Sequence, residues 1–326
     1  MRALACDLGG TNVRFGLGID GRLDPESVVQ LPNDRFSGFG AALKHYLGQA
    51  RVGGVDRAVV ALAAPIDGDT IRLTNRDWTI ARAEIAQIAG TGDVVLINDF
   101  VALGAALSRS EALATRPVLP GAAEQGVKLV LGAGTGFNAS ALVADGHVLA
   151  AEIGHTGFAP EPGLETELRD HFAGRFGRCS LDRVLSGSGL VALYRLACGR
   201  SGRAAQLDDA AAVTAEGAGG RDADAALACG TLAGMLGRTA GDLALTFLPR
   251  GGIYLTGGVT RALAPFIQGA DSPFARAFLA KGRMRELMQG FALDLVVDDS
   301  AALVGCLAWP DLPSNNVRGA CAAGPT

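Results

Sequence analysis

The sequence predicts an α/β protein of two lobes, because one supersecondary pattern occurs in it twice. Residues 3–7 form a short apolar run that is typical of a buried strand, a turn follows at residues 9–11, and residues 13–19 return to strand-forming residues. The same order of strand, glycine turn with a threonine, and strand recurs over residues 127–144. In a chain of 326 residues, this repeat predicts two related lobes whose turns face one ligand.

The remaining segments alternate in the manner of an α/β chain. We expect strands at 55–63, 94–97, 251–255 and 291–297, and helices at 101–107, 164–176, 189–197, 208–216, 222–247 and 301–308. These elements divide the chain into a small α/β lobe (1–108 with 299–310) and a large α+β lobe (109–298). Residues 311–326 read as a flexible tail.

Composition excludes several classes of function. The net charge is −4 and no basic stripe is present, so we expect no nucleic-acid partner. We expect no secretory signal, and the longest uncharged apolar stretch, 225–237, is shorter than the ~20 residues of a membrane span. The six cysteines form no Cys-x-x-Cys pair, which favours reduced thiols and a cytoplasmic location.

The two glycine turns are candidates for binding phosphate. The turn at residues 132–136 (Gly-Ala-Gly-Thr-Gly) lacks the lysine of a P-loop and leads into a strand, whereas P-loops and dinucleotide turns open a helix. Backbone N–H groups of such turns can converge on an anion, with Thr11 or Thr135 adding a hydroxyl. Ordinary hairpin turns remain the alternative. An acid before the first turn, Asp7, suggests an intervening cation such as Mg²⁺, or serves only the turn.

Several motifs together resemble a known family. Residues 7–12 (Asp-Leu-Gly-Gly-Thr-Asn) and 132–136 resemble the two phosphate loops of the hexokinase, actin and Hsp70 ATPase superfamily. Within this superfamily the chain is similar to bacterial glucokinases. Five further segments resemble motifs of that family and follow one another in the family's order: 64–68, 74–78, 97–100, 152–155 and 183–187. Residues 256–259 (Thr-Gly-Gly-Val) resemble the adenosine-side loop, and the likeness spans about residues 3–306.

This resemblance implies a two-lobe ribonuclease H-like fold of the actin/hexokinase type, with a cleft between the lobes that closes on the substrates. It implies ATP and Mg²⁺ as cofactors, glucose as the hexose phosphorylated at its 6-hydroxyl, and a homodimer. Mg²⁺ would be bound through the ATP phosphates, with Asp7 as a further candidate ligand. The implied ATP-binding residues are Asp7, Gly9, Gly10, Thr11, Asn12, Gly132, Gly134, Thr135, Gly136, Gly257 and Gly258.

Two adjacent polar residues, Asn98 and Asp99, follow the apolar strand 94–97. Either side chain could cap the helix that begins there. The resemblance instead implies that Asp99 is the general base that accepts the proton of the sugar hydroxyl. A carboxylate of pKa about 3.9 is a weak base, but the loose transition state of phosphoryl transfer demands little of it.

Sugar hydroxyls both donate and accept hydrogen bonds, so a hexose site needs carboxylates, amides and imidazoles. The resemblance places Asn98, Asp99, Glu152, His155 and Asp182 at sugar-binding positions. Asp182 stands where the family usually has Glu, and Asn138 where a third glycine is more usual. The cysteine cluster that binds zinc in related repressor–kinases does not follow His155, so we expect no zinc.

Other functions stay open at this point. The sugar could be mannose, fructose or an N-acetylhexosamine, and the donor could be polyphosphate or ADP. A catalytically silent sugar-binding regulator would usually carry a DNA-binding segment before the first loop, for which there is no room ahead of Asp7. An Hsp70-like ATPase would need a second substrate domain, which we do not find.

Overall fold

The computed structural model describes residues 1–50, 54–73 and 76–312, and the chain folds into two compact units. The first unit comprises Met1–Leu113, Leu142–Ala150 and the chain from Asp298 onward. The second unit comprises Ala114–Ala141 and Ala151–Val297. The expected lobes had boundaries near 108 and 299, without the segment 142–150. Residues 313–326 of the expected tail lie outside the described residues, whereas Asp311 forms an ion pair with Arg109 (Oδ2–Nη2 2.5 Å).

The first unit is built on a sheet of strand order β3-β2-β1-β5-β8, with β4 also paired to β2. Strand β1 runs antiparallel to β2 and parallel to β5, and β5 runs parallel to β8. The predicted strand–turn–strand at the start of the chain is therefore confirmed as the β1–β2 pair. The bounds are β1 (Arg2–Leu8), β2 (Asn12–Ile19), β3 (Arg22–Leu23), β4 (Val29–Pro32), β5 (Arg57–Leu62) and β8 (Val94–Asn98).

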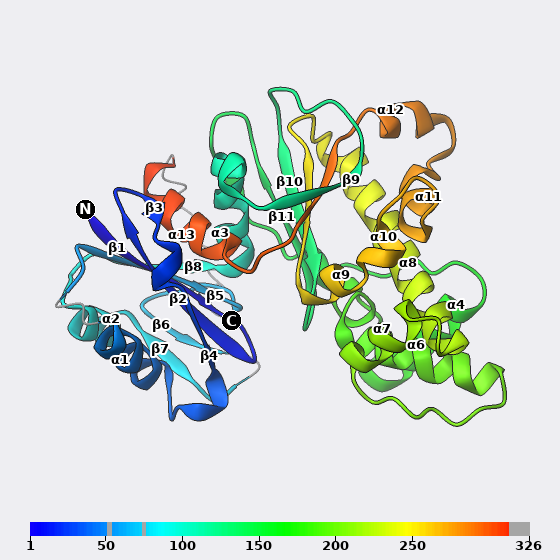
Figure 1. Ribbon diagram of the computed structural model, residues 1–326, viewed down its shortest axis with the longest axis horizontal. Helices are drawn as coiled ribbons and strands as arrows, with labels where there is room; N and C mark the ends of the chain where they lie inside the picture. Colours follow the sequence, from blue (N-terminus) through cyan, green and yellow to red (C-terminus); the bar gives the residue numbers. More distant parts are fainter. Residues whose placement is uncertain (51–53, 74–75, 313–326) are drawn as a thin grey trace, which may run out of the picture. The chain divides into compact units, whose positions relative to one another are not determined.

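Helices cover both faces of this sheet (Figure 1). On one face Phe15 stacks on Tyr46 of α1, with ring centroids 4.8 Å apart. On the other face α13 lies so close to β2 that a Cβ at Gly18 would meet the Leu307 side chain at 2.6 Å. The unit contains α1 (Phe39–Gln49), α2 (Arg82–Ala89), α3 (Asp99–Ala106), α13 (Ala301–Ala308), the strand pair β6 (Thr70–Arg72) and β7 (Thr79–Ala81), and β12 (Val148–Leu149). Its short 3₁₀ turns are η1 (Pro25–Ser27), η2 (Asn33–Arg35), η3 (Leu107–Ala112) and η6 (Trp309–Asp311).

The second unit contains a sheet in which β11, β10, β13, β14 and β9 are successive neighbours. Strands β10, β13 and β14 are parallel, and β9 closes the edge antiparallel to β14. The bounds are β9 (Thr115–Leu119), β10 (Lys128–Ala133), β11 (Phe137–Leu142), β13 (Ile253–Thr256) and β14 (Leu293–Val296). Strands β10 and β11 flank the second glycine turn, as the sequence predicted.

Helices make up most of the rest of the second unit (Figure 1). The long helix α8 is capped by Asp222, whose carboxylate accepts the N–H groups of Asp224 and Ala225. It is lined with small residues, and a Cβ at Gly237 would lie 2.2 Å from the carbonyl oxygen of Phe274 in α11. The helices are α4 (Leu164–Phe176), α5 (Leu181–Val184), α6 (Gly187–Arg200), α7 (Ala210–Ala218), α8 (Ala223–Phe247), α9 (Gly258–Ala262), α10 (Ala264–Ile267), α11 (Pro273–Leu279) and α12 (Arg285–Gln289), with η4 (Ile153–His155) and η5 (Gly282–Met284).

Most thiols of the described residues are buried. In the described part of the chain, Cys6, Cys179, Cys198, Cys229 and Cys306 are free, and Cys321 lies outside it. Burial raises the pKa of the Cys6 thiol well above its ordinary value, so this group behaves as a small apolar side chain. Among the described residues, no helix has both the length and the apolar content that crossing a bilayer requires.

The close crossing of α3 and α13 gives a stability prediction. A Cβ at Gly305 would lie 1.7 Å from the carbonyl oxygen of Ala102, which is backbone and cannot rotate away. Gly305→Ala should therefore force the two helices apart at a cost of about 1–3 kcal/mol. We expect a lower midpoint of thermal unfolding, measured by circular dichroism.

Gly48→Ala in α1 is the matched control, because a Cβ there meets nothing within 4 Å. Alanine is the better helix former, so the control should keep or slightly raise the unfolding midpoint. Equal midpoints for the two variants would contradict the packing described here.

Candidate functional site

The first glycine turn is held from one side by a single buried residue. The side-chain amide of Asn33 donates to the carbonyl oxygens of Gly9 (2.9 Å) and Gly10 (3.2 Å), and its backbone N–H donates to that of Thr11 (2.9 Å). Asn33 is fully buried, and its Oδ1 has no hydrogen-bond partner among the described residues. Three successive carbonyls are thus fixed toward Asn33, and the hydroxyl-bearing Thr11 is exposed.

Sequence reasoning missed Asn33. It lies in the 3₁₀ turn after β4, more than twenty residues from the turn that it holds, and no motif surrounds it. The role of this buried asparagine is apparent only in the folded chain, because the pairing of β2 with β4 brings residue 33 next to the first turn. The turn itself is closed by the N–H of Gly9, which donates to the carbonyl of Asn12 at 3.0 Å.

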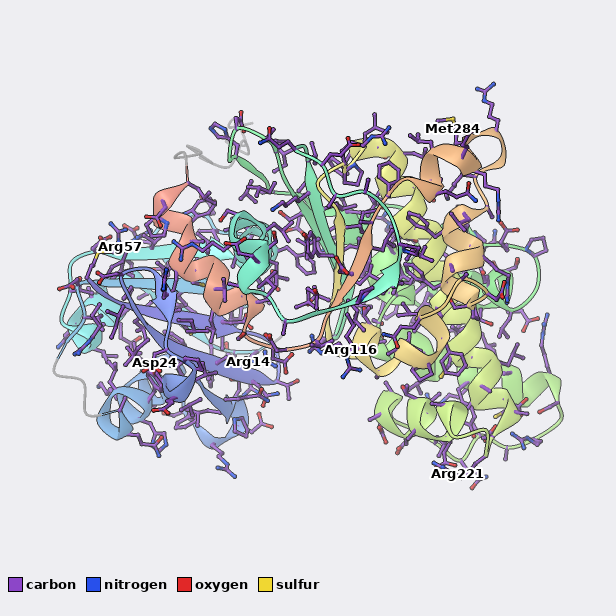
Figure 2. All side chains as sticks on the ribbon, turned by 45° about the horizontal axis from the view of Figure 1, so that its top comes forward. Arg14, Asp24, Arg57, Arg116, Arg221 and Met284 are labelled. Atoms are coloured by element: carbon purple, nitrogen blue, oxygen red, sulfur yellow. The ribbon has the colours of Figure 1, made fainter. Side chains whose placement is uncertain are left out.

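Asp7 lies near the end of β1, just before the first turn, and its side chain is 14% exposed. Its carboxylate pairs with Arg14 (Oδ2–Nη1 3.2 Å), and the same guanidinium pairs with Asp299 (3.0 Å); Figure 2 labels Arg14. Burial raises the pKa of the Asp7 carboxyl above its ordinary value, and the charge of Arg14 only partly opposes this effect. Two carboxylates therefore share one cation, an arrangement that favours a further positive charge nearby.

The pair Asn98 and Asp99 lies where β8 passes into α3. Asn98 is the N-cap: its Oδ1 accepts the N–H groups of Phe100 (2.9 Å) and Val101 (3.3 Å). Asp99 is the first residue of α3, and its Oδ1 also accepts the Phe100 N–H at 2.9 Å. Asn98 accepts two of the free N–H groups at the start of α3, and Asp99 is a second acceptor for one of them.

Strand register relates Asp99 to the first glycine turn. In the parallel strands β1, β5 and β8, Leu8 lies opposite Leu62, and Leu62 lies opposite Asn98. The first turn and Asp99 therefore both follow the carboxyl-terminal ends of these parallel strands. Two strand spacings, about 10 Å, separate them. A phosphate on the turn and a hydroxyl beside Asp99 could be neighbours at this edge.

In the second unit, two glycine segments pack backbone against backbone. A Cβ at Gly132 would lie 2.1 Å from the carbonyl oxygen of Thr256, and one at Gly257 would lie 2.3 Å from that of Ala133. Gly257 also has φ +97°, which side chains rarely tolerate. Thr260 at the start of α9 accepts the N–H of Ala133 at 2.9 Å. The second turn and the Thr-Gly-Gly-Val loop therefore form one rigid platform.

The exposed face of this platform is formed by Gly134, Thr135, Gly136 and Gly258. The N–H of Gly134 donates to the carbonyl of Gly136 at 2.8 Å, and the Thr135 side chain is exposed. The carbonyl of Gly134 accepts the N–H of Gly187 at 3.0 Å, which ties the turn to the start of α6. A cradle of this kind offers backbone N–H groups and one hydroxyl to an anion.

The predicted sugar-binding residues of the second unit gather around Asn138. The Asn138 amide donates to the carbonyl of Ala151 (2.9 Å) and to Glu152 Oε2 (3.5 Å), and its Oδ1 accepts the N–H of Gly154 (3.4 Å). Glu152 and His155 are exposed, with His155 Nε2 4.0 Å from Glu152 Oε2. Asn138 was noted in the sequence only as a departure from the glycine pattern, but it holds the segment that carries both side chains.

Asp182 joins this segment to the second turn. Its Oδ1 accepts the N–H of Phe137 at 3.0 Å, and a Cβ at Gly136 would lie 2.1 Å from that oxygen. Gly154 packs between the Phe137 carbonyl and the Cβ of Asp182, where no side chain would fit. The structure thus brings Asp182, Glu152 and His155 into one cluster beside the second turn.

No group of three or more His, Cys, Asp or Glu side chains in the described part of the chain is arranged to hold a metal ion. Two carboxylates lie next to the glycine turns: Asp7 precedes the first turn, and Asp182 lies against the second.

Comparison with known proteins shows the family of this chain. The glucokinase family model matches residues 4–311. Glucokinases of Marinobacter nauticus and Chromobacterium violaceum are each 37% identical over 93% of this chain and cover 95% and 87% of their own lengths.

Solved structures of glucokinases have a similar fold. A glucokinase from an Antarctic psychrotroph is 29% identical with a TM-score of 0.76, covering 94% of this chain and 98% of its own. A glucokinase of Balamuthia mandrillaris solved with glucose superposes with a TM-score of 0.78 at 19% identity, over 94% of this chain and 92% of its own. The predicted two-lobe fold of the actin/hexokinase ATPase type is confirmed by these likenesses. The chain therefore belongs to the glucokinase family.

Proposed function

We propose that this chain transfers the γ-phosphoryl group of ATP to the 6-hydroxyl of glucose, giving glucose 6-phosphate and ADP. Membership of the glucokinase family supports the reaction. The observation that carries the assignment of roles is the register of the first sheet, which brings the first glycine turn and Asp99 to one edge. A Streptomyces griseus sugar kinase of similar fold was solved with glucose and an ATP analogue.

In this proposal Asp99 accepts the proton of the attacking hydroxyl. Asn98 caps α3 and so fixes the backbone from which the Asp99 carboxylate projects. The transition state of phosphoryl transfer is loose, so the oxygen needs to lose its proton only late, and an ordinary carboxylate suffices. Positioning and electrostatic stabilisation then supply most of the rate enhancement.

The glycine segments hold the nucleotide in this proposal. The nucleotide phosphates lie against the first turn (Gly9, Gly10, Thr11 and Asn12) and the second turn (Gly132, Gly134, Thr135 and Gly136). The N–H groups of Gly9 and Gly134 close the turns themselves, so the donors to the phosphates are the exposed hydroxyls of Thr11 and Thr135 and the N–H groups that the turns leave unused. Gly257 and Gly258 lie at the adenosine side, on the platform described above. Asn33 keeps the carbonyls of the first turn away from the anion, where they would repel it.

A magnesium ion fits the first turn as a companion of ATP. Mg²⁺ usually keeps several waters and binds through one or two carboxylates plus substrate phosphates, a description that Asp7 meets. When bound, the ion would neutralise charge on the phosphates. Burial and the nearby charge of Asp299 both raise the pKa of the Asp7 carboxyl, and a bound cation would offset these effects.

In this proposal the residues that hydrogen-bond the glucose hydroxyls are Asn98, Asp99, Glu152, His155 and Asp182. A site that hydrogen-bonds each hydroxyl rejects sugars that lack one, because buried polar groups would remain unpaired. The alternatives to glucose are mannose, fructose and an N-acetylhexosamine. A homodimer and a cytoplasmic location stay predictions. Coupled assays of ADP release across a hexose panel would rank the sugars, and no sugar-dependent release would exclude the kinase.

Removing the base tests the central role. Asp99→Asn should lower kcat by about 10²–10⁴, the range of general-base catalysis, because the amide cannot take the proton. Glucose binding, followed by intrinsic fluorescence, should persist since the amide retains hydrogen-bonding capacity.

Glu111→Gln, which removes an exposed carboxylate elsewhere in the first unit, is the control and should keep the wild-type kcat. A kcat of Asp99→Asn within a few-fold of wild type would remove Asp99 from the role of base.

Asp7 is tested through the metal dependence of the rate. Asp7→Asn takes away a carboxylate oxygen that is a hard ligand for Mg²⁺. We expect the Mg²⁺ concentration for half-maximal rate, at fixed ATP, to rise by about tenfold or more, as for the loss of one charge-assisted contact. An unchanged Mg²⁺ titration would assign Asp7 to the ion pair with Arg14 alone.

Asp182 is tested through the sugar. Asp182→Asn should raise the KM for glucose by roughly 10- to 100-fold, because hydrogen bonds to a charged group are worth about 1.5–3 kcal/mol. The KM for ATP separates recognition from loop geometry: a rise confined to ATP would show that Asp182 acts on the second turn and not on the sugar.

A further inference from the structure

Arg76 belongs to a sequence motif, residues 74–78, that has no part in the proposed function so far. It is the first described residue of this motif, because 74 and 75 lie outside the described part of the chain. The Arg76 side chain is only 22% exposed. A guanidinium group that is largely removed from water needs compensating contacts, because its charge loses hydration there.

Two contacts hold the Arg76 guanidinium group. Its Nη2 pairs with Oδ1 of Asp34, and its Cζ lies 5.1 Å from the ring centroid of Trp78. Trp78 is buried in the core of the first unit, and its N–H donates to the carbonyl of Arg76 at 2.8 Å. The Asp34 carboxylate, in contrast, is 82% exposed. Arg76 is therefore fixed by the core, and the ion pair holds Asp34 in turn.

The ion pair acts one residue away from the support of the first glycine turn. Asp34 follows Asn33 in the 3₁₀ turn η2. Asn33 donates from its backbone N–H and its side-chain amide to the three carbonyls of residues 9–11. A continuous route of contacts therefore runs from the Trp78 ring, through Arg76 and η2, to the carbonyls of the first turn.

Two buried atoms on this route have no hydrogen-bond partner among the described residues: Nε of Arg76 and Oδ1 of Asn33. One is a donor and the other an acceptor, and they belong to residues that Asp34 joins. Leaving such atoms unpaired lowers the stability of the folded chain. The route is therefore not the arrangement of greatest stability, and unpaired buried groups of this kind call for an explanation other than stability.

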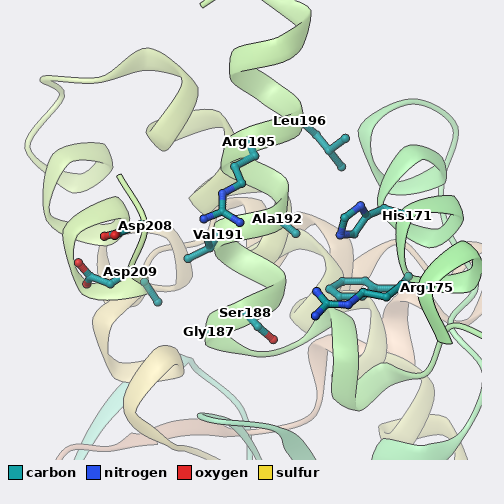
Figure 3. Close-up of a pocket in the computed structure, with 12 residues that line it drawn as sticks. His171, Arg175, Gly187, Ser188, Val191, Ala192, Arg195, Leu196, Asp208 and Asp209 are labelled. Carbon is teal, nitrogen blue, oxygen red and sulfur yellow. The ribbon is translucent and has the colours of Figure 1, made fainter. Parts of the chain in front are cut away.

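The second glycine turn is supported more directly. The N–H of Gly187, which Figure 3 labels at the start of α6, donates to the carbonyl of Gly134 at 3.0 Å. The first turn is held instead by Asn33 from a 3₁₀ turn of three residues. Among the described residues a Cβ at Gly10 would meet nothing within 4 Å, so close packing does not fix the tip of this turn. An anchor outside η2 therefore contributes more to the first turn than it would to the second.

We propose that Arg76 is a positioning residue for phosphoryl transfer, acting through Asp34 and Asn33 on the first glycine turn. This inference rests on the proposed kinase function, in which the first turn receives the phosphates of ATP. With the ion pair intact, the carbonyls of the turn stay directed at Asn33 and away from the phosphates. Without it, η2 and the turn fluctuate more, and the phosphates are held less closely.

The test compares Arg76→Gln with Arg72→Gln. Arg72 is the matched control, because it pairs with Asp77 (2.9 Å) only a few residues away but both side chains are exposed. Arg76→Gln should raise the KM for ATP by about three- to tenfold, the combined effect of losing an ion pair and a cation–π contact. Its kcat and its KM for glucose should stay within about twofold of wild type. Arg72→Gln should leave all three constants unchanged.

A second variant, Asp34→Asn, tests the route. Because the Asp34 side chain is exposed, this variant keeps the fold even if Arg76→Gln does not, and it alone should raise the KM for ATP. The double variant Asp34→Asn/Arg76→Gln should raise it no further than Arg76→Gln does, because residues that act as one unit are non-additive. Additive effects, or a rise in the KM for glucose alone, would overturn the proposed route. A wild-type KM for ATP in both single variants would overturn the role of Arg76.

Hydrogen exchange separates this inference from the proposed function, because it needs neither ligand nor turnover. Amide exchange in residues 8–13, followed by mass spectrometry, should be faster in Arg76→Gln than in wild type and unchanged in Arg72→Gln, since exchange reports local opening. A chain without sugar-dependent ADP release that still shows this difference would contradict the kinase function and leave the support of the first turn by Arg76 standing. An active kinase with unchanged exchange in Arg76→Gln would overturn only the inference.

Discussion

Close approach of backbone to backbone at glycine positions is the constraint on which the proposed nucleotide residues depend. At Gly132 and Gly257 a single extra carbon would lie within 2.3 Å of a carbonyl oxygen of the neighbouring segment. Strand β10 and the loop after β13 can therefore meet only because both carry glycine at these places. The hydrogen bond from Ala133 to Thr260 then fixes their relation. Hydrogen-bond donors that are already in position stabilise the charge of a bound anion without reorganisation of the protein.

The backbone of the first glycine turn is fixed in a different way. The carbonyls of Gly9 and Gly10 are held by one buried side chain, Asn33. A hydrogen bond to a buried amide contributes about 1 kcal/mol net, but leaving such groups unpaired costs more. The two turns thus have the same sequence pattern and different supports, which the repeat in the sequence does not reveal.

The sequence predicted the features that depend on local pattern. Strands β1, β2, β10 and β11 and helix α8 follow from runs of apolar residues and from glycine turns, and their positions agree with expectation within a few residues. The helix expected at 208–216 begins instead at Ala210, because Asp209 serves as its cap. Asn33 and Asn138 could not be predicted, since their partners are distant in the chain and become neighbours only through strand pairing.

Asp182 shows how a departure from the family pattern can be accommodated. Its oxygen fills the space that Gly136 leaves open and accepts the Phe137 N–H, so the shorter acid is already anchored on the second turn. Gly154 packs against both the Phe137 carbonyl and the Asp182 Cβ, which couples the segment of Glu152 and His155 to the same turn. Movement of either segment therefore moves the other. The carboxylate of Asp182 thus lies against the second turn, and the segments proposed to bind phosphate and sugar in this unit are in direct contact.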